Sequence, residues 1–170
     1  YVDDLRIERR RLGEALFEEE KRIAQGLGRE GLVNHVGQEI SYAAHLNAYG
    51  TQVPLADPRA HPRGMAPAAA VEFTHAHGGI VSLNHFFGVI EDTLPFNKAH
   101  YDGRVANLVA ARAWGADLLE VGYRRRGFGL HVFLDLWDRL SAAGIVITGV
   151  GVSDSHNNDV GWTSGPNNFI

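Results

Sequence analysis

Gly78-Gly79-Ile80-Val81-Ser82-Leu83-Asn84-His85 carries the clearest signal of the fold. Its apolar centre is typical of a strand inside a parallel sheet, where both faces are covered. A helical stretch leads into the two glycines, and two polar residues, Asn84 and His85, close the segment. In open α/β sheets, functional residues gather beyond the carboxyl ends of the strands. The segment therefore predicts an α/β fold with a candidate functional residue, His85, at a strand end.

The same alternation of strand-like and helical segments runs through the chain from residue 32. Short apolar runs predict strands at residues 33–41, 45–49, 80–84, 117–121 and 145–150. Helical patterns, each ending near a glycine, predict helices at residues 66–77, 104–114 and 130–143. Strands that alternate with helices in this way indicate a parallel sheet. The remaining segments, 51–67 and 86–103, are expected to be long loops of the kind that carry chemistry.

The first 30 residues differ from the rest in charge. They hold 15 charged residues, against 21 in the remaining 140. An apolar stripe at helical spacing runs through them, formed by Leu5, Leu12, Leu16 and Ile23. We therefore expect a charged helical segment, residues 1–30, that lies across a larger domain, residues 31–170. We also expect truncation at both ends, because Tyr1 is not a start Met and residues 161–170 stop on a strand-like run.

Composition limits the class of protein. The 170 residues are 45% hydrophobic and 21% charged, which is typical of a globular domain. A formal net charge of −4 provides no basic surface for nucleic acid, so we expect a small-molecule partner. No apolar run approaches the roughly 20 residues of a membrane span. The absence of cysteine excludes disulfides and thiolate metal sites and leaves the compartment open.

Acidic and imidazole side chains lie next to several predicted strands. Asp154 and His156 lie two residues apart, and in an extended segment such side chains project the same way. Glu39 lies in a strand-like run, where a carboxylate is costly to bury unless it is paired or bound to a cation. Oxygen and nitrogen ligands without sulfur suit zinc, manganese or iron. These residues predict a metal-dependent hydrolase.

Four of these segments follow one another in a characteristic order. They are Gly37-Gln38-Glu39-Ile40-Ser41, His45-Leu46-Asn47-Ala48-Tyr49-Gly50, the segment quoted first, and Ser153-Asp154-Ser155-His156. Together they resemble the PHP (polymerase and histidinol phosphatase) superfamily of metallohydrolases, in particular its carbaryl-hydrolase-like branch. The chain departs from that pattern in two places. It has no H-x-H pair before Glu39, and Phe86-Phe87-Gly88 follows His85 where the superfamily often has proline.

The resemblance implies a partial or distorted (β/α)7 barrel that lacks the opening H-x-H motif. It implies a hydrolase in which two or three divalent ions, zinc, manganese or iron, activate water against a phosphoester, ester or carbamate bond. The implied metal ligands are Glu39, His45, His85, Asp154 and His156. The implied catalytic residues are Glu39, His85, Asp154 and His156, with Glu39 bridging two ions.

Two other readings remain open. One is a non-catalytic metal-binding or structural PHP-like domain that has lost its first motif. The other, a polymerase-linked PHP nuclease module, is weaker because the basic surface it requires is not evident. Whether the isolated chain is active is also left open.

The other polar residues are expected to have lesser roles. His75 and His77 spell H-x-H, but they end a helix, so a structural role is expected for both. Asn47 is expected to orient a neighbour, and Glu120 ends a strand at a place that is often acidic in the family. Arg124-Arg125-Arg126 could hold an anionic substrate group or form a solvated loop. The histidines expected to be surface or packing residues are His35, His61, His100 and His131.

Overall fold

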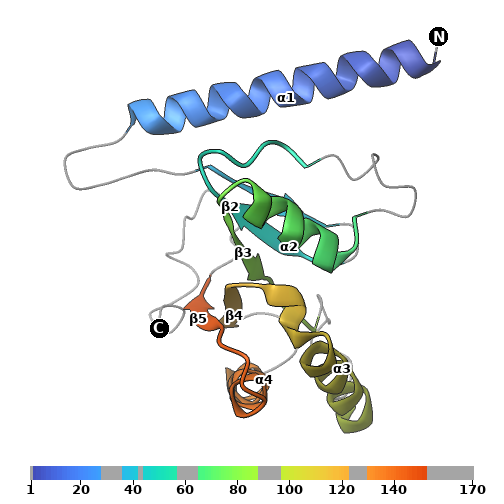
Figure 1. Ribbon diagram of the computed structural model, residues 1–170, viewed down its shortest axis with the longest axis vertical. Coiled ribbons are helices and arrows are strands. Elements are labelled where there is room, and N and C mark those ends of the chain that lie inside the picture. Colours follow the sequence, from blue (N-terminus) through green and yellow to red (C-terminus); the bar gives the residue numbers. More distant parts are fainter. Residues whose placement is uncertain are drawn as a thin grey trace.

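The chain forms an α/β structure built on an open, mixed sheet, as the computed structural model shows (Figure 1). The structure describes residues 2–27, 36–41, 44–56, 65–87, 97–122 and 130–152, with side chains from residue 13 onward. The five strands in these ranges are β1 (Gly37–Ile40), β2 (Leu46–Tyr49), β3 (Ile80–Leu83), β4 (Leu118–Gly122) and β5 (Thr148–Gly151). The helices are α1 (Val2–Gly26), α2 (Pro67–Ala76), α3 (Lys98–Ala110), α4 (Leu130–Ala142) and the short 3₁₀ element η2 (Arg112–Gly115). The predicted α/β class is confirmed.

Strand β2 runs against the direction predicted for it. The strands lie in the order β1-β2-β3-β4-β5, and β3, β4 and β5 are parallel, as expected. Strand β2 is antiparallel to both β1 and β3, so the prediction of an all-parallel sheet is wrong here. Only residues 41–45 join β1 to β2, whereas a parallel crossover needs about a dozen residues or more. As a result, the amino end of β2 lies at the same edge of the sheet as the carboxyl ends of the other strands.

The two faces of the sheet differ in chemistry. Paired residues on β1 to β4 form an apolar row, each at most 4% exposed: Ile40, Leu46, Leu83 and Leu119. The core continues from this row into helices α2 and α4, through residues such as Val71 and Leu136. Alternate residues point to the other face, where Glu39 lies opposite Asn47 and Asn47 lies opposite Ser82. The apolar face therefore holds the helices, while the other face carries polar residues.

Two adjacent glycines are required for different reasons where α2 meets the sheet. Gly78 has a φ of +70°, a left-handed conformation that glycine adopts at little cost after a helix. Gly79 lies against β2 instead. A Cβ at Gly79 would stand 2.6 Å from the carbonyl oxygen of Tyr49 and 2.4 Å from Val53 Cγ2. The first glycine provides a backbone conformation, and the second allows a close approach.

We expect Gly79→Ala to be more destabilising than Gly78→Ala. The added methyl group at position 79 meets a backbone oxygen that cannot move aside, so the free energy of unfolding should fall by about 2–3 kcal/mol. At position 78 nothing lies within 4 Å of the new Cβ, and only the left-handed backbone costs about 1 kcal/mol. Urea denaturation of both variants measures the difference. Equal losses would show that the close contact at Gly79 does not constrain the fold.

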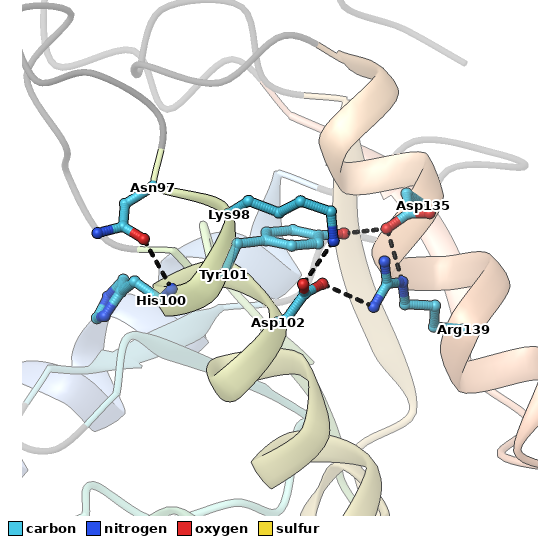
Figure 2. Close-up of polar contacts among 7 residues, drawn as sticks. All are labelled: Asn97, Lys98, His100, Tyr101, Asp102, Asp135 and Arg139. Atoms are coloured by element: carbon cyan, nitrogen blue, oxygen red, sulfur yellow. Dashed lines mark hydrogen bonds and ion pairs between the residues drawn. The ribbon is translucent and has the colours of Figure 1, made fainter.

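Helix α3 begins and ends earlier than predicted. It begins at Lys98 instead of residue 104 because Asn97 caps it, accepting a hydrogen bond from the His100 N–H at 3.0 Å (Figure 2). It ends at Ala110, ahead of three residues with positive φ: Arg112 (+50°), Ala113 (+49°) and Trp114 (+53°). Successive left-handed residues cannot continue a right-handed helix. The sequence pattern could not show this reversal, because none of the three residues is glycine.

A polar contact joins α3 to α4 (Figure 2). The Tyr101 hydroxyl donates to the Asp135 carboxylate, and the Val132 carbonyl oxygen is a second acceptor at 3.2 Å. Arg139 forms ion pairs with Asp102 at 3.0 Å and with Asp135 at 2.8 Å. Burial raises the pKa of Tyr101, and the hydrogen bond to Asp135 raises it further.

The raised pKa predicts a loss of stability at high pH. Tyrosine in the unfolded chain has a pKa of about 10, so the unfolded state loses its proton before the folded state does. The stabilisation is therefore complete below about pH 10 and is lost as the pH rises above that value. Tyr101→Phe should reduce this loss of stability at high pH. At neutral pH it should lower the free energy of unfolding by about 1 kcal/mol, because a hydrogen bond is removed. Urea denaturation from pH 8 to 11 measures both effects, and Tyr49→Phe is the control. If the free energy of unfolding fell equally steeply with pH in the wild type and in Tyr101→Phe, Tyr101 would not be the group responsible.

Helix α1 packs through a different face from the one predicted. In its described half, Leu16 and Ile23 are 56% and 47% exposed, while Phe17 and Lys21 are each 7% exposed. The Lys21 ammonium donates to the Val53 carbonyl oxygen at 2.8 Å and lies 4.7 Å from the Phe17 ring centroid. The aliphatic part of the Lys21 side chain thus packs against the domain, where the apolar stripe was expected to pack. None of the helices in the described ranges combines the length and apolar content needed to cross a membrane.

Candidate metal centre

Three side chains from different strands converge at the edge of the sheet. Glu39 lies in β1, His45 precedes β2 directly, and His85 follows β3. One carboxylate oxygen and one nitrogen from each ring lie within 4.8 Å of one another. The backbone explains the approach, since the Asn84 N–H donates to the His45 carbonyl oxygen at 2.9 Å and extends the pairing of β2 with β3. The reversed direction of β2 is what brings His45 to this edge.

A buried carboxylate on the next strand orients His85. Glu120 is 3% exposed and His85 is 4% exposed. The Glu120 Oε2 accepts the His85 backbone N–H at 2.6 Å and lies 3.2 Å from the Nδ1 of the same residue. A proton on Nδ1 satisfies this contact and leaves the lone pair of the ring on Nε2. An imidazole held by a carboxylate in this way has the arrangement found behind metal-binding histidines.

The backbone of His85 is also in an uncommon conformation. Its φ is +24°, outside the range that non-glycine residues normally adopt. Such a conformation costs on the order of 1–3 kcal/mol and persists only where the surroundings hold it. The bond from Glu120 to the His85 N–H provides that restraint.

Glu39 and His45 make direct contact in this structure. The His45 Nδ1 lies 2.7 Å from Glu39 Oε1, and the Ser41 hydroxyl donates to the same oxygen at 3.0 Å. Both side chains are about two-fifths exposed, so the pair is accessible to solvent. A carboxylate oxygen and an imidazole nitrogen this close together could both bind one divalent cation placed beside them.

A pocket of about 200 Å³ adjoins the cluster. His45 and His85 form part of its wall, together with Asn84, Phe86, Arg104 and Trp114. The sequence patterns did not single out Arg104 or Trp114, because both come from the segment of α3 and η2 that was predicted as one ordinary helix. The pocket gives the cluster a space in which a small ligand can bind.

The other predicted site residues are distributed as follows. Asp154 and His156 lie outside the described residues, as do the arginines 124–126 and His35 and His61. Strand β5 ends at Gly151, three positions before Asp154 in the chain, and its carboxyl end lies at the same edge as those of β3 and β4. The structure therefore brings together three of the five predicted metal ligands and does not describe the other two.

The H-x-H pair before the glycines lies apart from the cluster. The His75 Nε2 lies 2.9 Å from the Asp117 carboxylate, which also accepts the Val81 N–H at 2.8 Å, at the beginning of β3. The ring of His77 bonds to the Phe73 carbonyl oxygen at 2.7 Å. Both histidines thus have structural contacts at the opposite end of β3 from His85.

The contacts of Asn47 and Glu120 differ in how well the sequence predicts them. The Asn47 amide donates to the Tyr49 hydroxyl at 2.8 Å, so the neighbour that it contacts is not one of the predicted metal ligands. The contact that Glu120 makes was not predicted. A carboxylate between Leu119 and Val121 in an apolar strand was the available signal, because such a group requires a partner when it is buried. Which partner it takes depends on the neighbouring strand.

A scan of the sequence against protein-family models finds no match, and a search of curated proteins finds no similar sequence.

We expect Glu120→Gln to weaken metal binding at the cluster. Glutamine retains an acceptor for the His85 N–H, so the fold should persist, but it no longer offers a negative charge to the ring. Zinc affinity, measured by competition with a chromogenic chelator, should fall about 10- to 100-fold. Glu72→Gln, an exposed change on α2, is the matched control. Equal zinc affinity in both variants would show that Glu120 does not support a ligand.

Proposed function

We propose that this chain carries the metal centre of a metal-dependent hydrolase. The observation that supports the proposal is the cluster of Glu39, His45 and His85, with potential ligand atoms within 4.8 Å of one another beside a pocket. A carboxylate and two imidazoles form a typical ligand set for catalytic zinc, and manganese and iron also accept it.

The residues fit a divalent cation in their chemistry. All three donors are oxygen or nitrogen, and the chain contains no cysteine to provide a competing thiolate site. Such a cation supplies Lewis acidity, which activates water and polarises the bond to be hydrolysed. Three protein ligands leave further coordination positions for water and substrate, as in catalytic zinc sites.

The residues of the chain would have separate tasks in this reaction. His85, held through Nδ1 by Glu120, would present Nε2 as a ligand in a fixed orientation. Glu39 and His45 would complete the site from the exposed side, with the Ser41 hydroxyl orienting the Glu39 carboxylate. The aromatic rings at the pocket wall would limit the access of water to the substrate.

The resemblance to the PHP superfamily extends this proposal. In that reading, Asp154 and His156 complete a site for two or three divalent ions, and the open sheet is part of a (β/α)7 barrel. The substrate would be a small molecule with a phosphoester, ester or carbamate bond. The helices pack on one face of the sheet, opposite the face that carries Glu39, Asn47 and Ser82, and this supports the reading, because a barrel of this kind carries its helices on the outside.

We expect the zinc- or manganese-loaded chain to hydrolyse an activated ester, p-nitrophenyl phosphate or an aryl carbamate, and a chelator to stop the reaction. His85→Ala and Asp154→Ala should each reduce the rate by at least the roughly 10- to 100-fold that loss of a supporting residue costs. His77→Ala is the matched control, because the His77 ring bonds the Phe73 carbonyl oxygen at the opposite end of β3 from the cluster. With a p-nitrophenyl ester as the activated ester, the absorbance of the released p-nitrophenol measures hydrolysis of both the ester and the phosphate.

The alternative, a non-catalytic metal-binding domain, predicts a different pattern. Zinc would bind and depend on His85, but none of the three substrates would be hydrolysed. Activity that survives both the chelator and His85→Ala would exclude the metal-dependent mechanism. Failure to bind zinc or manganese would exclude both readings.

A further inference from the structure

Arg104 places a half-buried cation in the wall of the pocket beside the cluster. Its guanidinium donates to the carbonyl oxygens of Phe86 and of Phe87, the latter at 3.2 Å, and lies 5.0 Å from the Phe86 ring centroid. These bonds hold the turn that follows His85. They use two of the five N–H donors of a guanidinium, so the group can donate to a ligand as well.

The charge of Arg104 is not balanced by a carboxylate within the described ranges. Two of the other described arginines are balanced, since Arg22 pairs with Glu19 and Arg139 pairs with Asp102 and Asp135. Arg112 also has no carboxylate partner among the described residues, but its side chain is exposed to water, whereas that of Arg104 is half-buried. Burial lowers the pKa of Arg104, because the charged form loses hydration. A cation that is partly removed from water is stabilised by an opposite charge, and an anion in the pocket would supply one.

The rest of the pocket wall narrows the chemistry of the ligand. The Asn84 side chain is buried, and its Oδ1 accepts no hydrogen bond from the described residues, so it suits an O–H or N–H donor. Phe86 and Trp114 provide apolar surface. The residues that form the described wall include no aspartate or glutamate that would repel an anion. With a volume of about 200 Å³, the pocket accommodates a small group.

We propose that this pocket binds a small anionic substrate, with a carboxylate or phosphate group held by Arg104 and an apolar part against Trp114 and Phe86. A guanidinium suits either group, because its N–H donors match two oxygen atoms at once. The inference rests on the proposed hydrolase function and specifies its substrate class. It places anion recognition on Arg104 of α3, a residue that the sequence patterns did not single out.

The test compares matched ligands on the chelator-treated chain, so that no metal contributes to anion binding. Calorimetric titration with benzoate and with its neutral isostere benzamide isolates the charge, and titration with inorganic phosphate separates phosphate from carboxylate recognition. We expect benzoate or phosphate to bind at least about ten-fold more tightly than benzamide, the scale of one charge-assisted hydrogen bond. Arg104→Gln should remove this preference. Arg112→Gln, an exposed arginine that bonds the Gly144 carbonyl oxygen, should retain it.

Each outcome supports or overturns the inference. Equal affinities for benzoate, phosphate and benzamide in the wild type overturn it, as does a preference that survives in Arg104→Gln. If Arg104→Gln fails to fold because the turn is lost, Arg104→Lys keeps the charge with fewer N–H donors and takes its place. The comparison of benzoate and phosphate with benzamide on the wild-type chain still tests the anion preference. Anion binding through Arg104 without hydrolysis of any substrate would overturn the proposed function alone. Metal-dependent hydrolysis with no anion preference would overturn this inference alone.

Discussion

The buried contact between Glu120 and His85 is the constraint on which the candidate site depends. It joins the carboxyl ends of two neighbouring parallel strands, β3 and β4, through both the backbone and the ring of one histidine. Burying a carboxylate is costly without such partners, so neither residue tolerates the loss of the other easily. The contact also maintains a backbone conformation at His85 that an isolated strand end would not adopt.

The direction of β2 is the second condition for the site. In an all-parallel sheet the amino end of each strand lies opposite the functional edge, and His45 would be far from His85. The short connection after β1 reverses the chain, so that Glu39 and His45 meet across an antiparallel pair. One hairpin within an otherwise parallel sheet thus adds two side chains to the edge where α/β folds concentrate their chemistry.

Two parts of the chain with left-handed backbone shape the pocket. His85 forms one side of it, and the turn through Trp114 forms another. Arg104 connects these regions, because its guanidinium bonds the carbonyl groups after His85 from its position on α3. Arg104 therefore holds the turn after His85 and also forms part of the wall of the pocket.

The local sequence was sufficient to identify the α/β class and the approximate positions of the elements. Glu39, His45 and His85, which meet at one edge, were singled out as a set through the resemblance to the PHP superfamily. Apolar runs and glycines act over a few residues, so they can be read from neighbouring positions alone, as at Gly78 and Ile80–Leu83. The direction of β2 could have been read in the same way, because the few residues between β1 and β2 are too short for a parallel crossover. The buried face of α1 and the partner of Glu120 could not. Each depends on contacts between residues far apart in the chain: Lys21 with Val53, and His85 with Glu120. Such contacts arise only when the elements pack, because packing determines which buried polar group finds which partner.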